Sequence, residues 1–258
     1  MRFIIAVDLE GVAGVVGLPG KGLTKENCPE EYDLARREAV RAINAAARAL
    51  FEGGAVRVVV WDNHANGVNL PPEMIDGRCE ILRGAMPERF CGAEEFDGAL
   101  FIGYHAMAGT GDGVLNHTFS SATIQYIRVN GVDVGEIAVD AHYAGLKGVP
   151  VIFIESDAAG VREAARVLPW ARAVVTKEGT GRNGALCLHP EQVEAETYEK
   201  VADAVANIEE MGLFWFDAPL TVEVRYMRME DARACLTSDA ELVDEYTVRR
   251  VMDVLKLF

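Results

Sequence analysis

The sequence has 258 residues, half of them hydrophobic, and 25 Lys and Arg against 40 Asp and Glu give it a formal net charge of −15. This length suits one large domain or a domain with a small companion, and the apolar content excludes a disordered chain. The negative charge argues against non-specific binding to nucleic acid or to an anionic membrane, so we expect neither as a partner.

No apolar run approaches the roughly 18 residues of a membrane span, and the N-terminus lacks the apolar region and cleavage site of a signal peptide. The five cysteines are scattered and form no CxxC pair. They therefore indicate neither a disulfide framework nor a thiolate zinc site. From these features we expect a cytoplasmic protein.

Apolar, β-branched runs alternate with helical patterns along the chain. The first half predicts strands and one helix, in the order strand 3–7, helix 29–51, strand 55–61, strand 96–104 and a hairpin over 123–134 whose turn is Asn130-Gly131. The second half continues with helix 136–147, strand 150–155, helix 158–168, strand 171–177, helix 191–211, strand 220–227 and helix 244–255.

This alternation is typical of an α/β fold with a mainly parallel sheet covered by helices, and the hairpin adds an antiparallel piece. Near residue 190 the pattern changes to helix, half-exposed strand and helix. We therefore expect a metal-binding α/β catalytic core over residues 1–190 and a smaller C-terminal α+β lobe over residues 191–258.

Polar side chains follow several of the predicted strands, where open α/β sheets bind their ligands. Asp8 and Glu10 follow the first strand, His64 the second and His105 the third, and Glu136 follows the hairpin. Singly, the aspartate could cap a turn and each histidine could be a half-buried strand end. Two carboxylates on one face, however, repel each other unless a cation or a proton joins them.

Together these residues have the composition of a two-metal hydrolytic site. Carboxylate oxygen and imidazole nitrogen suit Zn²⁺, with Mn²⁺ or Co²⁺ possible. Two such ions about 3.5–4 Å apart can polarise a carbonyl and generate a bridging hydroxide near neutral pH. Asp8 comes directly off the central strand, and we expect it to bridge the two ions.

An ordered set of motifs resembles the D-aminopeptidases of the dipeptide-transport-protein-A type, which are self-compartmentalising two-zinc metallopeptidases. The motifs are VDLEG at 7–11, DNH at 62–64, GYHAMAG at 103–109, LNHT at 115–118, NG followed by GE at 130–136, and KEGTGRNGALCLHP at 177–190. By resemblance, two zinc ions per subunit are held by Asp8, Glu10, His64, His105 and Glu136.

The resemblance also implies a catalytic role for His117, which would act on the reacting carbonyl without binding metal, by moving a proton or stabilising the oxyanion. Otherwise His117 is a loop histidine that faces water. The implied activity is hydrolysis of short peptides with D-amino acids at the N-terminus, in a homo-oligomer of stacked rings, a decamer. Ala6 and Ala65 replace the usual serine and glycine, which bears on specificity more than on metal binding.

Residues 179–184 read GxGxxG, but no helix begins within them, as a dinucleotide site requires. We interpret this segment as a plain glycine turn or as a flexible loop that places Lys177 or Arg182 near a substrate carboxylate. Asp62, two residues before His64, could either orient that histidine or cap a turn.

Two other functions fit the same residues. A two-metal phosphoesterase would favour several basic side chains around the metals, and only Arg128, Lys177 and Arg182 come near the expected rim. A non-catalytic oligomeric module could keep the residues as a structural metal site.

Overall fold

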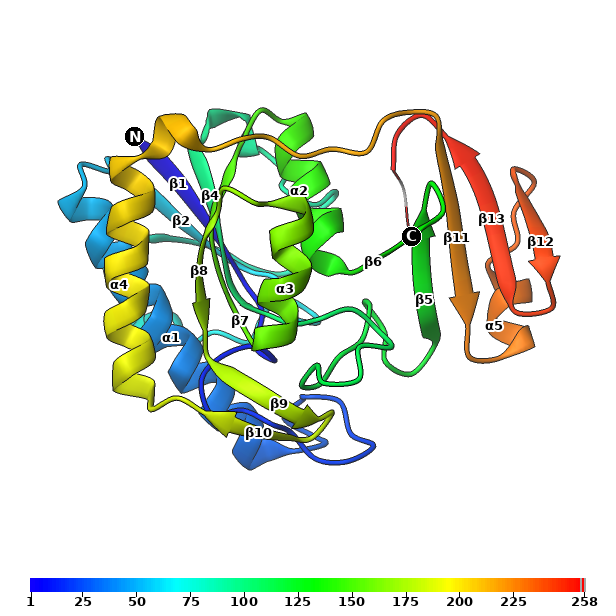
Figure 1. Ribbon diagram of the computed structural model, residues 1–258, viewed down its shortest axis with the longest axis horizontal. Coiled ribbons are helices and arrows are strands. Elements are labelled where there is room, and N and C mark those ends of the chain that lie inside the picture. The colour runs from blue at the N-terminus through cyan, green and yellow to red at the C-terminus, as the bar shows by residue number, and fades with distance from the viewer. Residues whose placement is uncertain (256, 258) are drawn as a thin grey trace.

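The computed structural model describes residues 1–255 and 257, and its main sheet has six strands in the order β3-β2-β1-β4-β7-β8 (Figure 1). All neighbouring pairs in this sheet are parallel. The bounds are β1 Arg2–Val7, β2 Arg57–Asp62, β3 Glu80–Leu82, β4 Gly98–Tyr104, β7 Val151–Ser156 and β8 Arg172–Val175.

Helices cover both faces of this sheet, α1 and α4 on one side and α2 and α3 on the other (Figure 1). Alternation along β1 explains the two layers, because Phe3 and Ile5 pack toward α1 and α4 while Ile4 and Ala6 pack toward α2 and α3. The helices span α1 Pro29–Glu52, α2 Glu136–Leu146, α3 Ala158–Val167 and α4 Pro190–Ala206. The predicted α/β class with a covered, mainly parallel sheet is confirmed.

A five-stranded antiparallel sheet, in the order β12-β13-β11-β5-β6, lies at the far end of the molecule beyond α2 (Figure 1). Its strands are β5 Ile124–Val129, β6 Val132–Val134, β11 Leu220–Tyr226, β12 Ala240–Asp244 and β13 Thr247–Met252, with α5 Met229–Ala234 beside them. Short 3-10 helices complete the chain at η1 Pro72–Met74, η2 Ala93–Glu95 and η3 Ile208–Glu210.

The helix predicted over residues 244–255 is wrong, because β12, a tight turn and β13 occupy most of this segment. In the turn, the Asp244 carboxylate accepts a 2.8 Å hydrogen bond from the main-chain N–H of Tyr246. β13 then pairs with β11 and buries Val248 against it. β-Branched side chains and a free strand edge outweigh the local helical pattern here.

The GxGxxG segment, which we interpreted as a glycine turn or a flexible loop, contains a turn between two paired strands. It forms an antiparallel hairpin of β9 Lys177–Gly181 and β10 Gly184–Cys187, which projects from the end of β8 (Figure 1). Arg182 and Asn183 form its turn.

The division at residue 190 stays a prediction, and residues 256 and 258 of the expected lobe lie outside the described residues. Two observations bear on it. Helix α4 shares a core with α1, whereas β11 pairs with β5 from the first half of the chain.

Among the described residues, none of the helices combines the length and apolar character needed to cross a membrane.

Candidate metal centre

Three of the predicted ligands follow three neighbouring strands of the main sheet. β1 lies between β2 and β4, so Asp8 at the end of β1 lies between His64, which follows β2, and His105, which follows β4. Glu10 comes from the turn after β1, and Glu136 is the first residue of α2. The topology thus brings together all five residues that the sequence nominated.

Two glycines allow the turn after β1 to lie directly against the end of β4. The Gly11 N–H donates to the main-chain oxygen of Gly103 at 2.7 Å. A Cβ on Gly11 would lie 1.8 Å from the Tyr104 main-chain oxygen, and one on Gly103 would lie 2.2 Å from that of Asp8. Only glycine permits this approach, which sets Asp8 and Glu10 beside the His105 segment.

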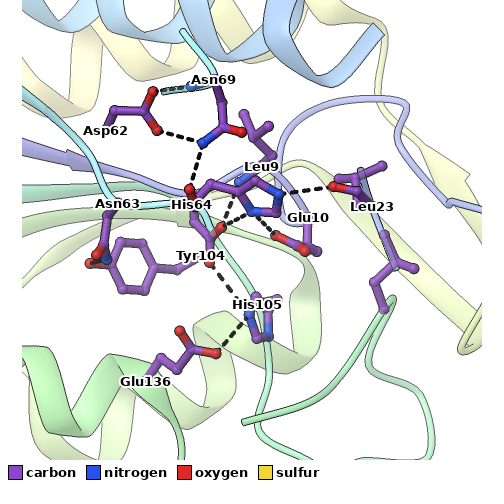
Figure 2. Close-up of polar contacts among 12 residues, drawn as sticks. Leu9, Glu10, Leu23, Asp62, Asn63, His64, Asn69, Tyr104, His105 and Glu136 are labelled. Carbon is purple, nitrogen blue, oxygen red and sulfur yellow. Dashed lines mark hydrogen bonds and ion pairs between the residues drawn. The ribbon is translucent and has the colours of Figure 1, made fainter. Parts of the chain in front are cut away.

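The first donor group consists of Asp8, Glu10 and His64, all of them buried. His64 Nδ1 lies 2.8 Å from Asp8 Oδ1 and 3.2 Å from Glu10 Oε2. Figure 2 shows Glu10 beside the His64 ring, with the Leu23 main chain on the other side of that ring.

The second donor group consists of His105, His117 and Glu136. His105 Nε2 lies 3.3 Å from Glu136 Oε1 (Figure 2), and His117 Nε2 lies 3.8 Å from the same oxygen. The His117 ring stacks on the His105 ring with centroids 4.1 Å apart. His105 Nε2 also lies 3.4 Å from Asp8 Oδ2, so the two oxygens of Asp8 face one histidine of each group.

Each of the three imidazoles has one nitrogen directed at a main-chain carbonyl. These contacts are His64 Nε2 to Leu23 at 2.9 Å, His105 Nδ1 to Ala106 at 3.0 Å and His117 Nδ1 to Leu115 at 2.8 Å. A carbonyl oxygen only accepts, so the facing nitrogen carries the proton. The opposite nitrogen of each ring is then free to offer its lone pair to a metal, as is usual for metal-binding histidines.

The pKa directions reflect the strong mutual attraction of the buried carboxylates and imidazoles. Burial raises the pKa of Asp8, but contacts with the His105 and His64 rings outweigh burial and hold that pKa well below its usual range. Burial lowers the pKa of both histidines, and the surrounding carboxylates outweigh it and raise both values well above the usual range. A metal ion would replace protons on these imidazoles.

Two buried atoms of the donor groups lack a hydrogen-bond partner in the described part of the chain, which also fits a zinc site. Glu10 Oε2 and His105 Nε2 are buried and make no hydrogen bond within the described residues. Buried polar atoms are almost always hydrogen-bonded, and buried carboxylates need a positive partner. Imidazole nitrogen with carboxylate oxygen is a zinc donor set, so the residues present fit the ion.

Lys177 has a different role from the substrate contact that we considered. Its side chain is fully buried, and Nζ donates to the main-chain oxygens of Glu10 at 2.7 Å and Val12 at 2.6 Å. It therefore fixes the turn that carries Glu10. A lysine at the end of an apolar strand was the only sequence signal for this role.

Asp62 caps a turn and does not contact the His64 ring. It accepts hydrogen bonds from the Leu70 N–H at 2.8 Å and the Asn69 side chain at 2.9 Å, and Asn69 in turn donates to the His64 main-chain oxygen (Figure 2). Ala65, which follows His64 directly, has a φ of 49°, in the left-handed region that favours glycine.

A cavity of about 640 Å³ adjoins the second donor group, and His117 lies in its wall. The His117 side chain keeps 17% of its surface exposed, whereas that of His105 keeps 1%. Of the histidines at this centre, His117 is therefore the one that a molecule in the cavity can reach.

Comparisons with known proteins agree with the motif resemblance. The chain is 29% identical over 211 residues to a D-aminopeptidase of Bacillus subtilis (strain 168), covering 80% of this chain and 74% of that protein. Its structure matches that of the Zn-dependent D-aminopeptidase DppA from Bacillus subtilis, a self-compartmentalizing protease, with a TM-score of 0.86 and 25% identity over 98% of this chain and 92% of the other. The family model for D-aminopeptidase matches residues 1–257, and the chain therefore belongs to the D-aminopeptidase family.

Proposed function

We propose that this protein is a zinc-dependent aminopeptidase that hydrolyses short peptides with a D-amino acid at the N-terminus. The observation that carries the proposal is the position of Asp8, whose two carboxylate oxygens face His64 at 2.8 Å and His105 at 3.4 Å. Asp8 therefore lies between the two donor groups and could link them into one centre. Family membership and the zinc dependence of the DppA relative support the same activity.

In this proposal two zinc ions bind per chain, and Mn²⁺ or Co²⁺ could replace them. The proposed ligands are Asp8, Glu10, His64, His105 and Glu136. When bound, the ions would polarise the scissile carbonyl and lower the pKa of a water molecule toward neutrality.

His117 is the proposed catalytic residue. The Leu115 carbonyl holds the proton on Nδ1, at 2.8 Å, so that Nε2 points toward the centre. From the cavity wall, Nε2 can accept a proton, and the protonated ring can then donate a hydrogen bond to the oxyanion or pass the proton to the departing amine. Its partial exposure supports this role over that of a third buried ligand in the second group.

The test is a chelator-reversible assay on matched dipeptides that begin with D-Ala or L-Ala. We expect hydrolysis of the D-Ala peptide, loss of activity on exhaustive chelation and its return with zinc. Full activity after chelation would refute the proposal. Hydrolysis of a phosphodiester and of no peptide would select the phosphoesterase alternative.

We further propose that the chain assembles into a closed homo-oligomer of stacked rings, a decamer, in the cytoplasm. The self-compartmentalizing character of DppA supports assembly. So does a concentration of exposed apolar side chains toward the C-terminal end, at Leu213, Trp215, Met227, Met229, Leu236, Leu242, Val243, Val251 and Val254. Light scattering coupled to gel filtration would measure the assembled mass, and a monomer at micromolar concentration would contradict this part of the proposal.

A further inference from the structure

We propose that Arg182, assisted by Lys21, binds the C-terminal carboxylate of a short peptide in the cavity beside His117. This inference rests on the proposed peptidase function and adds the feature of the substrate that the cavity recognises. It also gives a role to the turn of the β9–β10 hairpin, within the GxGxxG segment.

The first observation is the charge of the cavity wall. The wall contains the cations Lys21 and Arg182 and no aspartate or glutamate, in a chain that has 40 acidic residues. The remaining residues of the wall are His117 and neutral side chains or glycines, namely Gly20, Gly22, Asn27, Ala108, Gly109, Asn116, Ser121, Ala122, Ile124, Gln125 and Met227. Such a wall attracts an anion.

The second observation is that both cations are available. Within residues 1–255 and 257, neither the Arg182 guanidinium nor the Lys21 ammonium has an ion-pair or hydrogen-bond partner. The main chain of Asp112 lies against Gly179 of the same hairpin, and the Asp112 carboxylate pairs with Arg162. A guanidinium of this kind matches a carboxylate with two parallel hydrogen bonds.

The third observation is that the main chain of the turn is held firmly. The Arg182 main-chain oxygen accepts a 2.8 Å hydrogen bond from the Leu115 N–H, and the Asn183 side chain donates to the Val16 main-chain oxygen at 2.9 Å. Gly179 lets the hairpin lie directly against the main chain of Asp112, because a Cβ at residue 179 would lie 2.1 Å from the Asp112 main-chain oxygen. These hydrogen bonds fix the turn against the segments that contain Leu115 and Val16.

Charge and size together select the ligand. His117, at the metal centre, and the two cations Arg182 and Lys21 line the same cavity. A free dipeptide or tripeptide whose scissile bond lies at the metal centre extends its C-terminal carboxylate away from that bond, and a basic cavity wall matches this negative charge. The volume of about 640 Å³ lies within the range of small-ligand sites, roughly 300–1,000 Å³.

The experiment compares D-Ala-D-Ala with its C-terminal amide, which differs only in lacking the negative charge. Steady-state kinetics are measured for the zinc-loaded wild type, Arg182→Gln and the control Arg37→Gln, which removes an exposed arginine of α1. We expect the wild type to prefer the acid by about ten-fold or more. Arg182→Gln should lower kcat/KM for the acid by about ten- to hundred-fold, mainly through KM, and leave the amide within about two-fold.

The value of kcat/KM for the amide shows whether each variant is folded and loaded with zinc. An equal loss on both peptides in Arg182→Gln, or an unchanged preference for the acid, would overturn the inference. Wild-type turnover of neither peptide would overturn the proposed function itself. The Lys21 side chain is exposed, so Lys21→Gln should lower kcat/KM for the acid by no more than about five-fold. Arg37→Gln should leave kcat/KM unchanged for both substrates.

Discussion

The ammonium group of Lys177 donates a 2.7 Å hydrogen bond to the main-chain oxygen of Glu10, across 167 residues of sequence. A second bond, 2.6 Å long, goes to Val12. The side chain is fully buried, and burial lowers its pKa to about 8. A buried cation is thus used to fix the turn that presents a proposed metal ligand.

Replacing this cation should destabilise the protein. Lys177→Met leaves two buried carbonyls without their donor, each costing about 1–3 kcal/mol, so the free energy of unfolding should fall by about 2–6 kcal/mol. Urea denaturation measures the change. Lys200→Met, in the exposed face of α4, is the matched control and should have little effect. A loss below about 0.5 kcal/mol in Lys177→Met would contradict the anchoring role.

His117→Ala should separate catalysis from metal binding. We expect the variant to keep the zinc content of the wild type and to lose about 10²- to 10⁴-fold in kcat, the usual contribution of a general acid–base group. Metal analysis and kinetics on one sample measure both. The exposed His189→Ala is the control and should retain turnover. Near-normal turnover in His117→Ala would refute the catalytic role, and loss of one zinc would make this histidine a ligand.

Glu155 on β7 predicts a pH-dependent stability that is independent of the metal centre. It is fully buried, accepts one 2.9 Å hydrogen bond from Thr197, and burial raises its pKa from 4.5 to about 7. The folded state therefore holds the proton more tightly than the unfolded state. The contribution of Glu155 to stability is fully present below pH 4.5 and is lost as the pH rises through 7.

Glu155→Gln removes this titration and keeps an acceptor for Thr197. Its free energy of unfolding should exceed that of the wild type by about 3 kcal/mol at pH 8 and by under about 1 kcal/mol at pH 5. Denaturation at the two pH values measures the difference. Glu199→Gln, exposed on α4, should show no such trend. An equal effect at both values would show that Glu155 does not titrate in this range.

The strands, and the proximity of the residues nominated as ligands, could be predicted because each rests on a local pattern. Apolar runs mark buried parallel strands, and the residues just after them meet at one sheet edge. Asp8, His64 and His105 follow adjacent strands, so knowing the strand ends was enough to bring them together.

The errors concern contacts that join distant segments. Residues 244–252 form the end of β12, a tight turn and β13, because β13 can pair with the edge of β11. A local helical pattern in the sequence does not reveal this distant partner. Lys177 was misassigned because its partners are carbonyls near residue 10. Likewise, Arg182 has no ion-pair partner within residues 1–255 and 257 because of how distant segments pack around it, and the order of residues in the sequence does not show this packing.

The most direct test of the two-metal centre is zinc per chain, measured by mass spectrometry after equilibrium dialysis, in the wild type and in Asp8→Asn. Because Asp8 faces both donor groups, the account predicts two zinc ions in the wild type and loss of both, or near loss, in the variant, together with loss of D-dipeptide hydrolysis. A wild type that binds no zinc, or an Asp8→Asn variant that keeps two ions and full activity, would contradict it.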